Sequence, residues 1–336
     1  MIALNTLVAR LSFLGPLAPR STIHLARLCV IAALLALIVF GALRYDNFLS
    51  TFNILSFLRY NSMFALIALG MAFVIMTGGI DLSVGAVAAL ASVVAALFSP
   101  VHWAAGLFGG LSAGLMVGII NGLVVTRLRI QPFIATLAAM LAAYGTALLL
   151  AKNQSVSVSY DTGFTSIGQD DFFGFPVPAW IALFAYAAGW VVLERHPVGR
   201  RILAIGDGEL TAKLMGLKVE RLLFGVYASS GLLAGLAGVI LASQFGAGQP
   251  TEGVGWELFA IASVVVGGTL LTGGVGSIGA TLAGAVLLAM LFNILNFENG
   301  RGWISLSAYW QSVIRGVFLL AVVILQAKLA ASRREQ

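Results

Sequence analysis

Long apolar segments, separated by short polar or glycine-rich stretches, run along almost the whole chain. Ten are recognisable, at residues 28–43, 54–77, 82–98, 103–125, 133–151, 179–193, 223–244, 257–271, 278–295 and 309–326. A helix that crosses a bilayer directly needs about 20 apolar residues, and several segments are shorter. Short or glycine-broken spans indicate re-entrant or discontinuous helices. The pattern therefore predicts an all-α, polytopic membrane protein of about ten transmembrane helices.

The polar segments at the two ends predict tails on either side of a single transmembrane domain. Residues 1–27 carry three arginines and two prolines, which suits a cytoplasmic N-terminal tail, and residues 327–336 suit a cytoplasmic C-terminal tail. The domain between them covers residues 28–326. Its first segment differs from a signal peptide because the basic region before it is long and no small-x-small cleavage site follows.

The most polar interior segment covers residues 194–222. It holds ten of the 32 charged residues, counted as 19 basic plus 13 acidic. With ten spans and the N-terminus inside, 14 basic residues fall on the inside and only Arg44, Lys152 and Arg301 outside. Because Lys and Arg collect in cytoplasmic loops, both termini and this loop are expected in the cytoplasm. The loop of residues 152–178 is then the largest external segment, either a docking surface or a connection packed over the bundle.

Composition supports a membrane protein. Hydrophobic residues make up 60% of the chain and charged residues 10%, so the apolar excess must face lipid. The net charge of +6 is explained by topology, without nucleic acid as a partner. Cys29 is the only cysteine, which excludes a disulfide within the chain. The 39 glycines favour close helix packing.

Two glycine-broken turns indicate an internal repeat. Thr77-Gly-Gly-Ile-Asp-Leu-Ser-Val-Gly-Ala86 is echoed by Thr272-Gly-Gly-Val-Gly-Ser-Ile-Gly-Ala280, and each follows one apolar segment and opens another. Similar interruptions in two halves of a chain mark the pathway of repeat-built transporters. The candidate substrate-pathway residues in and near these turns are Thr77, Asp81, Ser83, Glu257, Thr269 and Thr272.

Two roles stay open for the acidic residues of this set. A carboxylate among apolar residues, such as Asp81, is by default a functional candidate. Asp81 and Ser83 also stand where a helix begins and can cap free backbone amides, which is the favoured interpretation. Glu257 either meets a polar ligand from outside or serves the helix dipole in a first turn. Arg315 is expected to pair with Glu298 or Glu257.

The absence of several motifs narrows the chemistry. The chain contains no Gly-x-x-x-x-Gly-Lys-Ser/Thr run, so it does not hydrolyse nucleotide through a P-loop. It also lacks His-Glu-x-x-His, Gly-x-Ser-x-Gly and Cys-x-x-Cys. We therefore expect no catalytic residues, metal site or cofactor in this chain.

Several motifs in order resemble the permease subunits of bacterial ABC importers for monosaccharides, the ribose and galactofuranose group. The resemblance rests on Gly78-Gly-Ile-Asp-Leu-Ser-Val-Gly85, Pro132-Phe-Ile-Ala-Thr-Leu137, Ala204-Ile-Gly206, Ala260-Ile-Ala-Ser-Val-Val-Val-Gly-Gly-Thr269 and Gly273-Gly-Val-Gly276. It implies a ten-span bundle in the bacterial inner membrane that dimerises, with an identical or a different permease chain, around a translocation pathway. ATP-binding subunits, which hold ATP and Mg, dock on the cytoplasmic side, and a periplasmic sugar-binding protein delivers substrate.

The resemblance also places a coupling helix in the cytoplasmic loop, carried by Glu209-Leu-Thr-Ala-Lys-Leu-Met-Gly216. Its candidate coupling residues are Glu209, Thr211, Ala212, Lys213 and Gly216. Phe259 stands where relatives often carry aspartate, which weakens a substrate contact around Glu257. The stretches 264–276 and 295–297 look closest to galactofuranose-type permeases.

Three other functions are alternatives to a monosaccharide permease. The nearest is a permease for branched-chain amino acids within the same ABC class. An ion-coupled secondary carrier would need several intramembrane acids, and Asp81 is nearly alone. A membrane-embedded glycosyl transferase would need clustered carboxylates or a cationic diphosphate site, and neither is found in the sequence.

Overall fold

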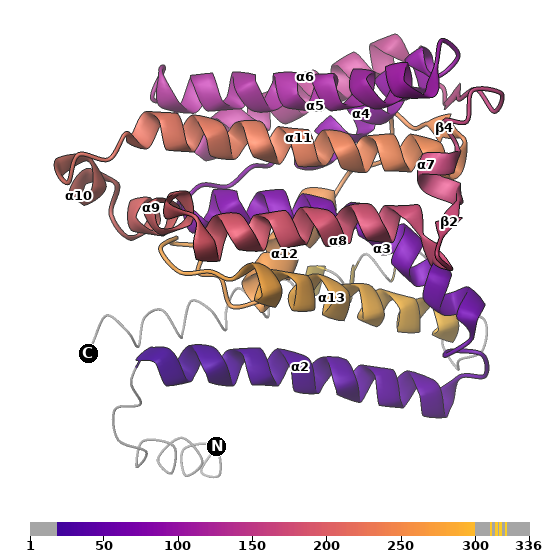
Figure 1. Ribbon diagram of the computed structural model, residues 1–336, viewed down its shortest axis with the longest axis horizontal. Coiled ribbons are helices and arrows are strands. Elements are labelled where there is room, and N and C mark those ends of the chain that lie inside the picture. Colours follow the sequence, from indigo (N-terminus) through magenta and orange to yellow (C-terminus); the bar gives the residue numbers. More distant parts are fainter. Residues whose placement is uncertain (1–18, 300–309, 311–312, 315, 318–319, 321–336) are drawn as a thin grey trace.

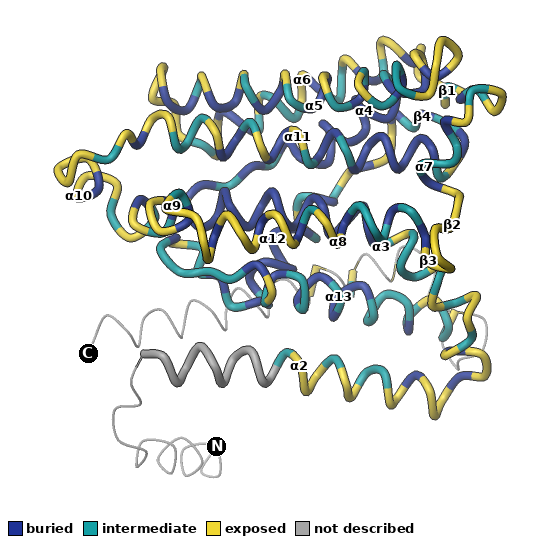
Figure 2. The backbone as a smooth tube through the Cα atoms, in the orientation of Figure 1, coloured by how far each residue is buried: buried dark blue, intermediate teal, exposed yellow. Residues whose placement is uncertain are grey.

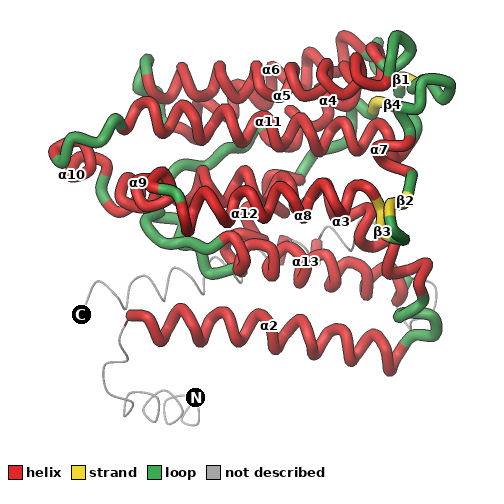
Figure 3. The backbone as a smooth tube through the Cα atoms, in the orientation of Figure 1, coloured by secondary structure: helices red, strands yellow, loops and turns green. Residues whose placement is uncertain are grey.

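The computed structural model describes residues 19–299, 310, 313–314, 316–317 and 320. Within them, helices lie side by side in a bundle, with α10 projecting from one end and the short strands gathered at the other (Figures 1 and 3). We name these the α10 end and the hairpin end. The long helices are α2 (Pro19–Arg44), α3 (Thr51–Met76), α5 (Trp103–Thr126), α6 (Pro132–Leu150), α11 (Val219–Phe245) and α13 (Ile278–Glu298). The shorter ones are α4 (Val84–Phe98), α7 (Ser166–Gln169), α8 (Val177–Trp190), α9 (Pro197–Asp207), α10 (Glu209–Leu214) and α12 (Trp256–Val266).

The first nine predicted apolar segments each coincide with a described helix. Six are long and apolar enough to cross a membrane, one of them formed by α8 and the π-helical turn η1 (Val191–Arg195) together. Three apolar stretches of helix are shorter, namely α4, α12 and Val30–Arg44 of α2. The all-α prediction is confirmed, while a total of about ten spans and the internal repeat stay predictions. The last segment at 309–326, Arg301, Arg315 and the tail at 327–336 lie wholly or largely outside the described residues.

The predicted start of the first apolar segment falls inside a helix. Residues 19–27, expected as part of the cytoplasmic N-terminal tail, are helical, because α2 begins at Pro19 and continues without a break to Arg44; the tail itself stays a prediction. Proline is favoured at the first position of a helix because its missing N–H has no partner there and its φ is already helical. No glycine and no second proline follow before residue 41, so nothing in the local sequence ends the helix. Residues 1–18 lie outside the described part.

Exposed apolar side chains cover the outer helices, as expected of a surface in lipid. Figure 2 shows exposed positions along α2, α6 and α8. Large side chains such as Leu141 on α6 and Phe184 on α8 are 64% and 66% exposed. In water an apolar surface of this extent would drive association, whereas in a bilayer it contacts acyl chains.

The centre of the bundle is built on α3, α4, α5 and α11. Every residue from 62 to 76 of α3 is buried. The helices α5 and α11 approach through glycines: a Cβ on Gly118 would lie 2.6 Å from the Tyr227 carbonyl oxygen, and one on Gly235 would lie 3.1 Å from the Gly114 Cα. Small residues allow such approach where lipid supplies no hydrophobic force between helices.

The two short helices α4 and α12 begin inside the bundle with their first turns together. Val84 and Trp256, their first residues, are 1% and 8% exposed. A Cβ on Gly253 would lie 2.8 Å from the Gly85 carbonyl carbon, so the backbones touch where both helices start. Each helix follows an irregular segment, at 77–83 and 246–255. This geometry is that of helices interrupted within the bundle.

The connection from α6 to α8 packs over the hairpin end. Its strand β1 (Val156–Ser157) pairs antiparallel with β4 (Ala247–Gly248), which follows α11, and β2 (Asp171–Phe172) pairs with β3 (Phe175–Pro176). The Ser243 hydroxyl accepts from the Gly168 N–H at 2.7 Å and donates to the Phe164 carbonyl at 2.8 Å. These bonds hold the connection against α11.

Candidate functional site

A cavity of about 650 Å³ lies between the first half of α3, the start of α12 and the last half of α13. Its polar lining side chains come from all three walls and include Asn53, Ser56, Asn61, Glu252, Asn293 and Asn296. Its aromatic lining side chains are Phe57, Tyr60, Phe64, Trp256, Phe259 and Phe292. A concave site with an aromatic wall and a few polar groups is typical of small-molecule binding.

Amide side chains tie the α3 and α13 walls together. The Asn293 Nδ2 donates to the Asn53 Oδ1 at 3.2 Å, while the Asn53 Nδ2 donates to the Phe48 carbonyl at 2.7 Å. Each carboxamide has two donor hydrogens and two acceptor lone pairs. Capacity for further hydrogen bonds is therefore left on the cavity side, matched to hydroxyl groups, which both donate and accept.

The aromatic wall is continuous across three helices, α3, α12 and α13. The ring centroids of Phe64 and Trp256 are 4.7 Å apart, and those of Phe64 and Phe259 are 4.8 Å apart. Phe259 continues the contact to Phe292 on α13 at 5.8 Å. These rings fix one another and present an apolar surface opposite the amides.

None of the six sequence-predicted pathway residues lines this cavity. The carboxylate of Glu257 points instead toward the start of α4, where its Oε2 would lie 3.0 Å from a Cβ on Gly85. Thr77 follows the last residue of α3, and its hydroxyl donates to the Val74 carbonyl at 2.7 Å. Thr269 is fully buried, whereas Thr272 is exposed. Phe259, noted in the sequence only as a departure, lines the cavity together with Trp256 of the same helix.

Asp81 and Ser83 lie together in a buried polar network. The Asp81 Oδ1 accepts from the Ser83 N–H at 3.0 Å and from the Ser83 hydroxyl at 2.6 Å. Its Oδ2 accepts from the Ser230 hydroxyl at 2.8 Å, and the Asn121 amide donates to the Ser83 hydroxyl at 2.9 Å. Asp81 is 1% exposed. Asp81 thus caps the Ser83 N–H just before α4 and joins this turn to α5 and α11, whereas the predicted capping by the Ser83 side chain is wrong, since it makes no cap bond to the helix.

The predicted coupling segment forms α10, which projects from the bundle (Figure 1). Leu210, Leu214 and Met215 are 72%, 81% and 75% exposed, and none of them was among the predicted coupling residues. Ala212 is buried with Ile205 and Val219 in a small cluster that fixes α10 to its own chain. A solvent-exposed apolar tip of this kind marks a protein-binding surface.

The other predicted residues of α10 have local roles in the described contacts. The Lys213 ammonium donates to the Glu209 carboxylate at 2.5 Å, one helical turn away. Thr211 is exposed. Gly216 has φ +80° and an added Cβ would meet open space, so the turn needs glycine for its backbone conformation and not to avoid crowding.

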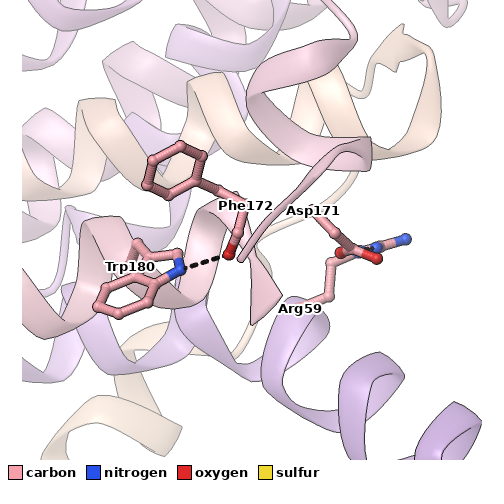
Figure 4. A network of polar contacts seen from close by, with 4 residues as sticks. All are labelled: Arg59, Asp171, Phe172 and Trp180. Carbon is pink, nitrogen blue, oxygen red and sulfur yellow. Dashed lines mark hydrogen bonds and ion pairs between the residues drawn. The ribbon is translucent and has the colours of Figure 1, made fainter. Parts of the chain in front are cut away.

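At the hairpin end, an ion pair joins the cavity wall to the β2–β3 hairpin. The Arg59 guanidinium on α3 lies 2.6 Å from the Asp171 carboxylate, and the Trp180 indole on α8 donates to the Phe172 carbonyl at 2.9 Å (Figure 4). Asp170 and Asp171 form an adjacent pair of carboxylates in the sequence. Within the described residues, no group of three His, Cys, Asp or Glu side chains is placed to hold a metal ion.

Residues 53–323 match the family described as the branched-chain amino acid transport system / permease component. The chain belongs to this family. It is 42% identical to the ribose import permease protein RbsC of Bacillus subtilis over 89% of this chain and 92% of the relative. It is 34% identical to the L-arabinose transport system permease protein AraH of Escherichia coli K12 over 92% and 94%, and 35% identical to the D-allose transport system permease protein AlsC of the same organism over 87% and 89%. No solved structure matches the chain.

Sequence reasoning missed the cavity of this permease, although a signal was present. Asn53, Ser56, Tyr60 and Asn61 recur at the spacing of one helical face, at the start of an otherwise apolar segment. Asn293 and Asn296 repeat this spacing near the end of another. Polar side chains on one face of a membrane helix face the protein interior or a watery cavity.

Proposed function

We propose that this chain is the membrane-spanning permease subunit of an ATP-driven ABC importer that moves a monosaccharide from the periplasm to the cytoplasm. The observation that carries the proposal is the cavity between α3, α12 and α13, which combines amide groups with an aromatic wall. Sugars present hydroxyls that need paired donors and acceptors, together with apolar C–H faces that need an apolar surface. The relatives named for ribose, L-arabinose and D-allose support the same substrate class.

We assign one partner to each end of the bundle. ABC ATP-binding subunits, which hold ATP and Mg, dock on the α10 tip of Leu210, Leu214 and Met215. A periplasmic sugar-binding protein docks at the hairpin end. This orientation places the basic loop and both termini in the cytoplasm of a multi-pass inner-membrane protein. A second permease chain, identical or different, completes the pathway.

The identity of the sugar is a finer proposal. The sequence similarities of 264–276 and 295–297 lean toward galactofuranose, whereas the relatives compared are named for pentoses and a hexose. Ribose is the sugar to test first. The second candidate, a branched-chain amino acid, is favoured by the description of the matching family. It is disfavoured because no Lys or Arg is among the described residues that line the cavity, so an amino acid carboxylate would find no positive partner there.

Uptake by cells that carry the complete importer tests this proposal. We expect labelled D-ribose to accumulate, L-arabinose, D-allose or galactofuranose to compete, and leucine to have no effect. Cells that carry the ATP-binding subunits and the binding protein without this permease serve as the control. Accumulation of leucine with no uptake or competition by any sugar would overturn the monosaccharide assignment.

A further inference from the structure

Three backbone segments meet at the α10 end with no side chain between them. They are residues 76–78 at the end of α3, 206–207 at the end of α9 and 273–274 in the connection from α12 to α13. The Gly274 N–H donates to the Met76 carbonyl at 3.1 Å. A Cβ on Gly206 would overlap both the oxygen and the nitrogen of this hydrogen bond. The Cα of Gly206 therefore rests directly on the bond that joins the other two segments.

The two glycine turns singled out in the sequence form the other sides of this junction. Gly78 and Gly273 have φ of +81° and +84°. A Cβ on Gly273 would lie 2.7 Å from the Gly78 nitrogen and 2.9 Å from the Gly206 Cα. Gly274 faces Asp207, whose Cα would be 3.1 Å from an added Cβ. A larger residue at Gly206 or Gly273 must push the segments apart.

The joined segments connect the cavity to α10. The helix α3 forms one cavity wall with its first half and ends at the junction, while the connection 267–277 joins α12 and α13, the other two walls. On the opposite side, Gly206 lies just before α10, and Ala212 of α10 packs with Ile205 of α9. A displacement of α10 thus reaches all three cavity walls through one point of backbone contact.

We propose that Gly206 is a positioning residue of the transport cycle. Through it, movement of α10 displaces the end of α3 and the α12–α13 connection together and so reshapes the cavity. Close-packed backbones shift as units and do not deform gradually, so contact without side chains transmits small displacements. The inference rests on the proposed function, because it concerns how the ATP-binding subunits act on that cavity.

The test is Gly206→Ala in the complete importer, reconstituted with its ATP-binding subunits and binding protein. We expect ATP hydrolysis to persist while the amount of ribose moved per ATP falls about tenfold, the size of effect that coupling residues produce. Gly225→Ala on α11, where an added Cβ meets open space, is the matched control and should leave this ratio unchanged. An unchanged ratio in Gly206→Ala would overturn the proposal. If the unmodified importer moves no sugar, that result contradicts the proposed function and not the role of Gly206.

A cross-link provides a test that does not depend on tolerance of a new methyl group. Asp207→Cys and Thr272→Cys are introduced with Cys29→Ser, which removes the only native cysteine. Both sites are exposed. If the junction moves as one unit, joining the two thiols with a short bifunctional reagent should leave ribose transport intact. Loss of transport on cross-linking would show that α9 slides over the turn. Failure of the two thiols to cross-link would contradict the close approach of Asp207 to this turn. Either result overturns the proposal.

Discussion

The Asp81 carboxylate accepts a hydrogen bond from the Ser230 hydroxyl at 2.8 Å and thereby fixes the turn before α4 to the middle of α11. The other carboxylate oxygen is occupied by Ser83, and the whole group is 1% exposed. With three hydrogen bonds from the protein and almost no exposed surface, its geometry matches a structural role that caps the Ser83 N–H. The ligand-contact alternative raised from the sequence has no accessible surface to act through in this conformation.

Asp81→Ala should lower the free energy of unfolding by about 3 kcal/mol, because buried donors on Ser83 and Ser230 lose their acceptor. Thermal unfolding of the purified permease in detergent measures the change. Ser229→Ala, which removes an exposed hydroxyl bonded within its own helix, is the control and should have little effect. A variant of Asp81 with native stability but no sugar transport would contradict the capping role.

Asn293→Ala should raise the KM for sugar uptake about tenfold, since the loss of one well-placed hydrogen bond is worth roughly 1–2 kcal/mol. The concentration dependence of uptake measures this effect. Thr146→Ala on the exposed face of α6, where the hydroxyl bonds the Ala142 carbonyl, is the matched polar deletion outside the cavity. Equal KM values for the two variants would show that the cavity is not part of the substrate pathway.

Leu214→Asp should abolish co-purification of the ATP-binding subunits, because it places a charge in the centre of the exposed α10 tip and an unpaired buried charge is costly. Lys152→Ala removes an exposed side chain in the connection that packs over the hairpin end, away from α10, and serves as the control. Retention of the ATP-binding subunits by Leu214→Asp would place their docking surface elsewhere.

Tyr45→Phe should destabilise the hairpin end, where the Tyr45 hydroxyl donates to the Glu298 carboxylate at 2.5 Å. Burial, and then the bond to Glu298, raise the pKa of Tyr45 from 10.0 to about 12. Because the neutral form is favoured in the folded state, its contribution is complete below pH 10.0 and is lost as the pH rises through about 12. Unfolding curves of the native and variant proteins should therefore differ by about 1–2 kcal/mol at neutral pH and converge in that window. A difference that grows above pH 10.0 would contradict the assignment.

The sequence predicted the helices well because apolar length is a strong signal in a membrane protein. The start of α2 was not predicted, since Arg20 and Arg27 suggested a tail although neither residue ends a helix. The pathway residues were sought at the glycine turns, where a repeat was visible, whereas the cavity is lined by Asn53, Asn293 and Phe259 from helices distant in sequence. Periodicity indicates which face is polar, but it cannot show which faces meet.

In the proposed function, ATP hydrolysis by separate subunits drives sugar through this permease. Proteoliposomes that contain the complete importer, supplied with the sugar-loaded binding protein, measure this directly. We predict ribose accumulation that requires ATP, stops when the ATP-binding subunits are omitted and does not respond to a proton or sodium gradient. Accumulation by the permease alone, driven by an ion gradient, would contradict the account.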